Sequence, residues 1–251
     1  MNRLFKYIKQ PLWNNWYIDK KIGQGNYSEV YRIYSGNKVS ALKVKPVFAE
    51  NYESLKRKLT VAEKEANIIS LMKDCPYIMK YQNKEIQKIS DLQYLIMIQT
   101  ELLNPINEIQ IFSENEVHKI AIDIGKALEY IHSSGVVHCD VKPDNFFISS
   151  SGIYKIGDFN ISGYAGEKRY FSGTFEYTAP EVYNSNIYDY RSDIYSFGKS
   201  LYNLMNNISS EFLQIIEKAC SELHSRYQTI TEMLSDIYRI EKHYYVSWEY
   251  F

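Results

Sequence analysis

The most informative stretch of the sequence is His138-Cys139-Asp140-Val141-Lys142-Pro143-Asp144-Asn145. It places a carboxylate (Asp140), an ammonium group (Lys142) and a carboxamide (Asn145) within six residues. Such a carboxylate can accept a hydroxyl proton, and such an ammonium group can compensate the charge of a transferring phosphoryl group. A carboxamide oxygen can ligate a hard cation. The stretch therefore predicts a site for phosphoryl transfer rather than an ordinary polar loop.

Further motifs follow this stretch toward the C-terminus. In Lys155-Ile156-Gly157-Asp158-Phe159-Asn160, an aspartate comes directly after a short apolar strand, which suits a magnesium ligand. Three more motifs lie beyond it: Gly173-Thr174-Phe175-Glu176-Tyr177-Thr178-Ala179-Pro180-Glu181, Asp193-Ile194-Tyr195-Ser196-Phe197-Gly198 and Ser225-Arg226-Tyr227.

Two motifs near the N-terminus are weaker when they are taken alone. Two glycines in Gly23-Gln24-Gly25-Asn26-Tyr27-Ser28-Glu29-Val30 let a backbone approach a phosphate closely, but a glycine hairpin without a ligand is the default interpretation. Ala41-Leu42-Lys43 carries a lysine between apolar residues, and such a lysine is commonly a surface cation.

The hydrophobic pattern predicts strands first and helices afterwards. Alternating residues over 16–45, divided by a turn at Ser35-Gly36-Asn37, predict a hairpin, and 92–100 predicts another strand. Apolar residues spaced by three and four over 55–69 predict a helix. A capping box, Ser113 and Glu116, begins the next helix, which Gly135 ends, and further helices are predicted over about 192–206, 210–221 and 229–240.

Composition narrows the function classes. Lys plus Arg is 29 and Asp plus Glu is 30, so the net charge of −1 gives no electrostatic basis for binding nucleic acid or an anionic membrane. The three cysteines are widely spaced, which suits a reducing compartment. The sequence contains neither a signal peptide nor an apolar run of 18 residues. We expect a soluble, cytoplasmic protein that binds neither nucleic acid nor membranes.

In this order and spacing, the seven motifs resemble those of the eukaryotic-type protein kinases, and in particular the Ser/Thr kinases including compact bacterial members, over residues 16–240. The resemblance implies an α+β, bilobal fold. An antiparallel β small lobe with one helix would span 16–103, and a mainly α-helical large lobe would span 104–240. Residues 1–15 would form an N-terminal extension and 241–251 an aromatic tail.

The resemblance also implies ATP as cofactor. Lys43 would hold the α and β phosphates and would pair with an acid of the first long helix. Glu63 and Glu65 are both candidates, and Glu65 fits the family register because Ile69 follows it by four residues. Thr100 would be the gatekeeper, and the segment after it would bind adenine through its backbone. The expected nucleotide residues are Ile22, Gly23, Gln24, Gly25, Asn26, Val30, Ala41, Lys43, Thr100, Glu101, Leu103 and Phe147.

For the chemical step, the resemblance assigns Asp140 to accept the substrate's hydroxyl proton and Lys142 to stabilise the γ-phosphate. Asn145 and Asp158 would hold Mg²⁺. Lysine two places after the aspartate, together with Gly173-Thr174, favours Ser/Thr acceptors on protein substrates.

The resemblance gives structural roles to further residues. Glu181 and Arg226 would form a buried ion pair of the large lobe. Asp193 would anchor the backbone of the catalytic loop, and His138 would pack beneath Phe159.

The sequence departs from the family in four places. Cys139 replaces the arginine that normally reads a phosphate on the activation loop, so activity should not depend strictly on phosphorylation of that loop. Asn160 replaces a glycine at a position that often needs unusual φ and ψ, which asparagine tolerates. The connection 206–211 is short, and the tail 243–251 is aromatic and expected to pack on its own domain.

Two rival functions remain open at this stage. A pseudokinase that binds nucleotide and scaffolds a partner is suggested by the substitutions at Cys139 and Asn160, although Lys43, Asp140 and Asp158 are all present. A kinase acting on a small molecule is disfavoured by the intact segment 173–181. Neither the physiological substrate nor the oligomeric state can be read from the sequence.

Overall fold

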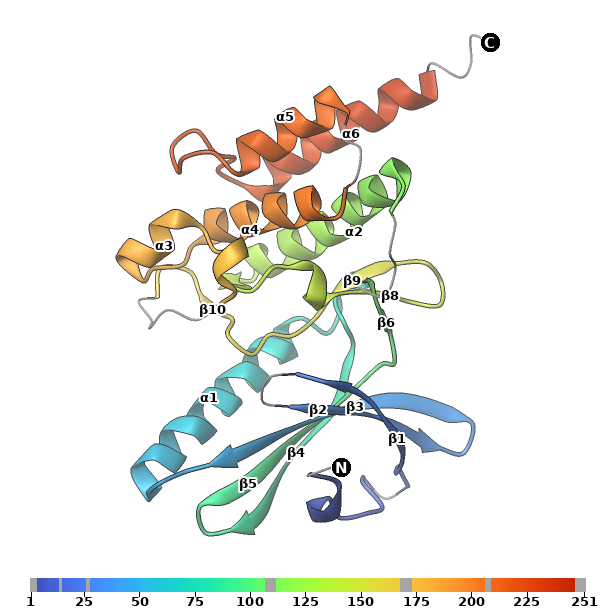
Figure 1. The fold of residues 1–251 in the computed structure, drawn as a ribbon, viewed down its shortest axis with the longest axis vertical. Helices are drawn as coiled ribbons and strands as arrows, with labels where there is room; N and C mark the ends of the chain where they lie inside the picture. The colour runs from blue at the N-terminus through green and yellow to red at the C-terminus, as the bar shows by residue number, and fades with distance from the viewer. Residues whose placement is uncertain are drawn as a thin grey trace. The chain divides into compact units, whose positions relative to one another are not determined.

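The structure is a computed structural model that describes residues 4–13, 15–25, 28–106, 112–167, 173–205 and 209–246, with side chains described up to residue 240. The chain divides into two compact units (Figure 1). Unit 1 comprises residues 1–73 and 79–103, and unit 2 comprises 74–78 and 104–251. Asn26 and the side chains of the aromatic tail lie outside the described residues.

Unit 1 is built on a five-stranded antiparallel sheet with the order β1-β2-β3-β5-β4. The predicted hairpin is confirmed, since β2 and β3 pair across the turn that contains Gly36, whose φ is +57°. The strands are β1 (Tyr17–Gln24), β2 (Glu29–Ser35), β3 (Lys38–Phe48), β4 (Tyr81–Ser90) and β5 (Gln93–Thr100).

One long helix accompanies this sheet, as predicted. Helix α1 (Tyr52–Leu71) begins at Asn51, whose side chain accepts a hydrogen bond from the backbone N–H of Ser54. Leu55 and Ala62 of α1 are buried against Val47 of β3 and the β5 residues Ile96 and Ile98. Successive side chains of a strand alternate between faces, so α1 covers one face of the sheet.

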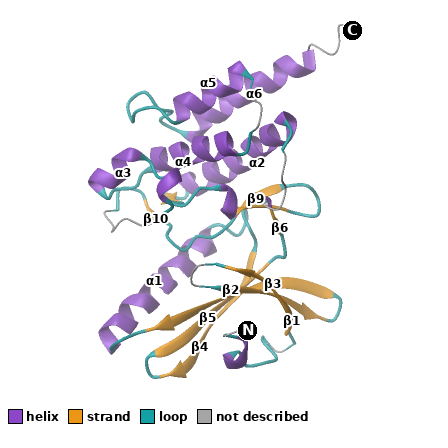
Figure 2. Ribbon diagram, viewed as in Figure 1, coloured by secondary structure: helices purple, strands orange, loops and turns teal. Residues whose placement is uncertain are grey.

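Unit 2 is mainly helical (Figure 2). Helix α2 begins with the predicted capping box at Ser113 and Glu116, and Gly135, with φ +76°, follows its end. Helix α2 packs on α6, and α4 packs on α5. The helices are α2 (Glu114–Ser133), α3 (Pro180–Ser185), α4 (Tyr190–Asn203), α5 (Ser210–Ala219) and α6 (Ile230–Val246).

Short strands place the polar loops of unit 2. They form a sheet in the order β6-β8-β9 and a two-stranded pair, β10 with β7. The strands are β6 (Asn104–Pro105), β7 (Val136–Val137), β8 (Phe146–Ile148), β9 (Tyr154–Ile156) and β10 (Gly163–Tyr164).

These elements confirm an antiparallel sheet followed by a helical region. Helix α6 continues to Val246, six residues past the predicted end of the large lobe. Among the described helices, none combines the length and the apolar character that crossing a membrane requires. All three cysteines are free thiols.

Candidate functional site

Five of the candidate nucleotide residues of unit 1 lie on one face of the sheet. In the strand register, Gly23 lies opposite Val30, and Val30 lies opposite Lys43. In the next row, Ala41 lies opposite Thr100. Residues directly opposite in an antiparallel pair project to the same face, and so do residues two apart on one strand. The β-sheet therefore brings together residues that are up to 77 positions apart in the sequence.

The glycine turn joins β1 to β2. The backbone N–H of Gly25 donates to the carbonyl of Ser28 at 2.9 Å, which closes the turn. Gln24 pairs with Glu29, and Ile22 lies at an irregularity of β1 with a largely exposed side chain. A Cβ on Gly25 would lie 2.9 Å from the Ser28 hydroxyl oxygen, so a larger residue at this position would require that hydroxyl to rotate away.

The segment after β5 is held by two hydrogen bonds between Glu101 and Lys80. The N–H of Glu101 donates to the Lys80 carbonyl at 2.9 Å, and the Glu101 carboxylate accepts from the Lys80 N–H at 2.7 Å. The hydroxyl of Thr100 donates to the carbonyl of Glu101 at 3.1 Å. Leu103, the last residue of unit 1, is partly buried.

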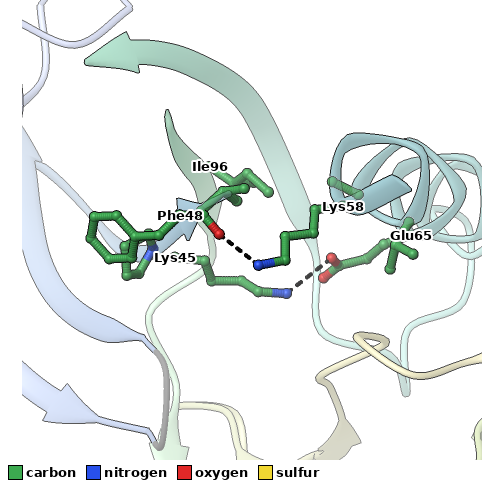
Figure 3. Close-up of a pocket in the computed structure, with 9 residues that line it drawn as sticks. Lys45, Phe48, Lys58, Glu65 and Ile96 are labelled. Carbon is green, nitrogen blue, oxygen red and sulfur yellow. Dashed lines mark hydrogen bonds and ion pairs between the residues drawn. The ribbon is translucent and has the colours of Figure 1, made fainter. Parts of the chain in front are cut away.

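Of the two candidate acids on α1, Glu65 faces the sheet and Glu63 is exposed. The carboxylate of Glu65 is buried, with 4% of its side chain exposed, and it accepts a hydrogen bond from Lys45 Nζ at 3.3 Å (Figure 3). The same pocket is lined by Lys58, whose Nζ donates to the carbonyl of Phe48 at 2.6 Å. The sequence led us to expect Lys43 as the partner of Glu65. The structure shows that Lys45 is also a partner of this carboxylate.

Three lysines project from the sheet toward α1. Lys43 and Lys45 are two residues apart on β3, and Lys84 of β4 lies opposite Ile98 in the register row of Lys43. Burial lowers the pKa of Lys84, against the attraction of Glu65. Glu65 is thus a buried carboxylate on the side of α1 toward which these lysines project.

The candidate catalytic residues of unit 2 form a connected group. Lys142 Nζ lies 3.0 Å from Asp140 Oδ2 and donates to the hydroxyl of Thr174 at 2.6 Å. That hydroxyl donates to Asp140 Oδ1 at 3.0 Å. The hydroxyl thereby links a carboxylate and an ammonium group, and each of these two side chains is 17% exposed. The group combines a proton acceptor and a cation, which is the pairing that transfer to a hydroxyl requires.

The candidate metal ligands belong to neighbouring loops. Asn145 Nδ2 donates to both the carbonyl and Oδ2 of Asp140, at 2.7 and 3.0 Å. The amide is planar, so its Oδ1 points away from Asp140. The carbonyl of Asn145 accepts from the N–H of Gly157, which brings the neighbouring Asp158 to the same region of unit 2. A carboxylate and a carboxamide oxygen are the hard donors that Mg²⁺ prefers.

A single buried carboxylate holds the backbone before Asp140. Asp193 Oδ2 accepts from the N–H of His138 at 2.7 Å and bonds His132 Nε2 at 3.0 Å, while its Oδ1 accepts from the N–H of Cys139 at 2.8 Å. These bonds hold Cys139 in the left-handed region, with φ +69°. The sequence-based prediction that Asp193 anchors this loop is confirmed.

Two other predicted contacts are also confirmed. The rings of His138 and Phe159 lie 5.0 Å apart, and His138 Nε2 bonds the carbonyl of Gly157 at 3.1 Å. Arg226 pairs with Glu181 through two bonds, at 2.6 and 3.2 Å, and the arginine side chain is buried.

The left-handed residue of this segment is Asp158, with φ +66°, and not Asn160, which stands at the position where the family has a glycine. The reversal therefore falls on the aspartate itself, two residues earlier. This conformation sets the direction of the carboxylate that the sequence assigned to a metal ion.

Comparison with known proteins decides the family. The profile of the "Protein kinase domain" family matches residues 16–247. The chain belongs to the protein kinase family. A probable serine/threonine-protein kinase of Clostridium perfringens is 28% identical to this kinase domain over 277 residues, which cover 94% of the chain and 39% of the relative.

Two eukaryotic relatives are similar. Serine/threonine-protein kinase Nek4 of Mus musculus is 29% identical over 73% of the chain and 24% of its own length. Serine/threonine-protein kinase Aurora-1 of Arabidopsis thaliana is 30% identical over 76% of the chain and 65% of its own length. The kinase domain thus spans less than two thirds of the length of each of these three relatives.

Sequence analysis missed two side chains of this site. Thr174 was used only, together with Gly173, to favour Ser/Thr acceptors, and its separation of 34 residues from Asp140 gave no local signal of a bond between them. Lys45 could have been found, because it shares a strand face with Lys43 and therefore also points toward α1.

We predict that Asp193→Asn destabilises unit 2 of the kinase domain. An asparagine presents an N–H₂ group where one of the two carboxylate oxygens stood, so at least one buried donor loses its acceptor, at a cost of about 1–3 kcal/mol. The measurement is thermal and urea unfolding of the variant and the wild type.

The matched control is Asp189→Asn at the N-cap of the same helix, α4. Asparagine caps a helix about as well as aspartate, and the ion pair with Arg191 is half-exposed, so the loss should stay below about 1 kcal/mol. Equal effects of the two substitutions would contradict the anchoring role of Asp193.

Proposed function

We propose that the chain is a protein kinase that transfers the γ-phosphoryl group of ATP to Ser or Thr hydroxyls of protein substrates, with Mg²⁺. The observation that carries the proposal is the bonded group of Asp140, Lys142 and Thr174 in unit 2. The relatives named as serine/threonine-protein kinases support the choice of acceptor.

Asp140 and Lys142 carry the chemical step in this proposal. Asp140 accepts a bond from the acceptor hydroxyl, orients its oxygen toward the γ-phosphorus and takes up the proton as the new P–O bond forms and the bond to ADP breaks. Lys142 compensates negative charge on the transferring group. The Thr174 hydroxyl bonds both groups, which holds their side chains in position relative to each other.

Mg²⁺ would be held by Asn145 and Asp158. The amide of Asn145 directs its nitrogen to Asp140, which leaves its oxygen as the donor for a cation. When bound, the ion would neutralise negative charge on the phosphates of the nucleotide. The protein's own contribution is to hold these two oxygen donors on loops joined by the bond from Gly157 to Asn145.

Unit 1 would hold the nucleotide. The proposal places the phosphates at the glycine turn and at Lys43, which lie on one face of the sheet. The adenine would lie against Val30, Ala41 and Thr100 and would bond the backbone of the segment 101–103. Phe147 of unit 2 is a further proposed adenine contact.

Activity should not require a phosphate on the activation segment. At the position where kinases often carry an arginine, the thiol of Cys139 donates to the carbonyl of Val137 at 3.3 Å. Cys139 packs with Val137, Ala179, Val182 and Tyr188 in an apolar cluster. Since Ala179 and Val182 belong to the segment that follows Thr174, apolar burial supports this segment without a phosphate-binding cation.

The first test of the proposed function is transfer of labelled phosphate from ATP and Mg²⁺ to a generic basic protein. Asp140→Asn removes the proton acceptor and should lower the transfer rate by about 10²–10⁴-fold. Lys43→Met should also abolish most incorporation. Phosphoamino-acid analysis should find phosphoserine and phosphothreonine.

The control for Asp140→Asn is Asp144→Asn, an exposed aspartate of the same loop, which should retain wild-type activity. Wild-type protein that bound ATP with Mg²⁺ but incorporated no label would contradict catalysis. That result would favour a pseudokinase that binds nucleotide and scaffolds a partner.

We further predict that treatment with a protein phosphatase changes the transfer rate by less than about two-fold, because Cys139 provides no charge to read a phosphate. The dephosphorylated state is verified by mass spectrometry before the rate is measured. A loss of ten-fold or more that autophosphorylation restored would contradict this independence.

A further inference from the structure

The N-terminal residues cover the face of the unit 1 sheet that is opposite α1. Leu4, Ile8 and Leu12 are buried. They belong to one hydrophobic cluster with side chains of the three central strands, which are Tyr31, Ile33, Leu42, Val44, Leu95 and Met97. On β3 and β5 these residues alternate with those that face α1, so the sheet lies between α1 and the N-terminal segment (residues 4–12).

Polar contacts tie the N-terminal segment to the sheet at several places. The side chain of Gln87 on β4 donates to the carbonyl of Tyr7 at 2.6 Å and accepts from the N–H of Lys9 at 3.2 Å. Leu12 and Trp16 exchange two backbone hydrogen bonds, at 2.8 and 2.9 Å. The segment is therefore an ordered part of the kinase fold.

Leu4, the first residue of this segment, bonds a buried carboxylate. Glu29 is 7% exposed, and its Oε2 accepts from the N–H of Leu4 at 3.4 Å and from the hydroxyl of Tyr31. Its Oε1 accepts from Lys21 Nζ at 2.7 Å. Burial raises the pKa of Glu29, but the hydrogen bonds from Lys21 and Tyr31 lower it, and the result lies below the usual value. Glu29 is therefore ionised at neutral pH.

Glu29 is also the first residue after the glycine turn. It pairs with Gln24 across the hairpin, and the next pair is Gly23 with Val30. Lys21 spans the two strands, since its Nζ bonds both Glu29 and the side chain of Gln24, the latter at 2.9 Å. Both strand ends that carry the turn are thus bonded to one charged network beneath the N-terminal segment.

We propose that Glu29 is a positioning residue through which the N-terminal segment holds Gly23 and Gly25 in place for the phosphate groups of the nucleotide. The inference rests on the proposed function, since it assumes that this turn binds ATP. In this role, the N-terminal extension would influence how tightly the protein binds the phosphates of ATP. The contacts of residues 4–12 would not influence how tightly it binds the nucleoside.

The test compares the binding of ATP with the binding of adenosine by calorimetry. Glu29→Gln keeps the size of the side chain and removes its charge. It should weaken ATP binding about ten-fold and change adenosine binding by less than two-fold, because adenosine has no phosphate to contact the turn. A double substitution, Leu4→Ala with Ile8→Ala, leaves the carboxylate intact and should cause the same selective loss.

The matched control is Glu85→Gln, an exposed glutamate on β4, the opposite edge strand of the sheet, and it should bind both ligands as the wild type does. Tyr31→Phe removes only the hydroxyl donor. This variant replaces Glu29→Gln in the test if Glu29→Gln does not fold, and it should weaken ATP binding about two- to three-fold.

An unchanged ratio of ATP to adenosine affinity in the folded variants, or an equal loss for both ligands, would overturn this inference alone. Wild-type protein that bound adenosine and ATP with equal affinity would show that the turn makes no phosphate contact, which overturns the inference while catalysis is judged separately by phosphate transfer. Wild-type protein that bound neither ligand would overturn the proposed function and the inference with it.

Discussion

The carboxylate of Asp193 is the constraint on which the candidate catalytic loop of unit 2 depends. It is fully buried and accepts from two consecutive backbone N–H groups, those of His138 and Cys139. A left-handed backbone at a residue with a side chain costs about 1–2 kcal/mol. Each hydrogen bond to a charged acceptor contributes about 1.5–3 kcal/mol, so the two bonds outweigh the strain at Cys139.

The consequences of this constraint extend along the loop. The chain reverses at Cys139, and Asp140 then meets Lys142, Asn145 and Thr174. The carbonyl of His138 accepts from the hydroxyl of Ser162 at 3.0 Å, which ties the loop to the segment after Asp158. Helix α4 therefore helps to position the Asp140 carboxylate, for which we propose a catalytic role, because Asp193 lies in its first turn.

Much of this arrangement could be predicted from the sequence because the decisive residues are close together in it. Asp140, Lys142 and Asn145 lie within one turn, and spacing alone places them in one loop. The capping box at Ser113 and Glu116 is likewise a local signal. The pairing of β2 with β3 follows from the alternation of apolar and polar residues along both strands. The turn at Gly36 then sets the register of this pair.

The contacts that escaped prediction join residues that are distant in the sequence. Leu4 bonds Glu29 across 25 residues of sequence, and Gln87 bonds Tyr7 across 80. Both contacts depend on the assembled sheet, so no local pattern predicts them. Strand alternation places Lys45 on the same face as Lys43, but the contact of Lys45 with Glu65 also depends on where α1 lies against β3. The left-handed backbone of this segment lies at Asp158 and not at Asn160. Contacts of the surrounding loop determine this position, and the sequence pattern does not show them.

The measurement that tests the account most directly is single-turnover phosphoryl transfer by Asp193→Asn with saturating ATP and Mg²⁺, at a temperature where the variant is folded. Asp193 holds the backbone before Asp140 and belongs to unit 2, whereas the proposed phosphate and adenine contacts belong mainly to unit 1. The account predicts a transfer rate at least ten-fold lower with ATP affinity within two-fold of the wild type. A wild-type transfer rate in the folded variant would contradict it.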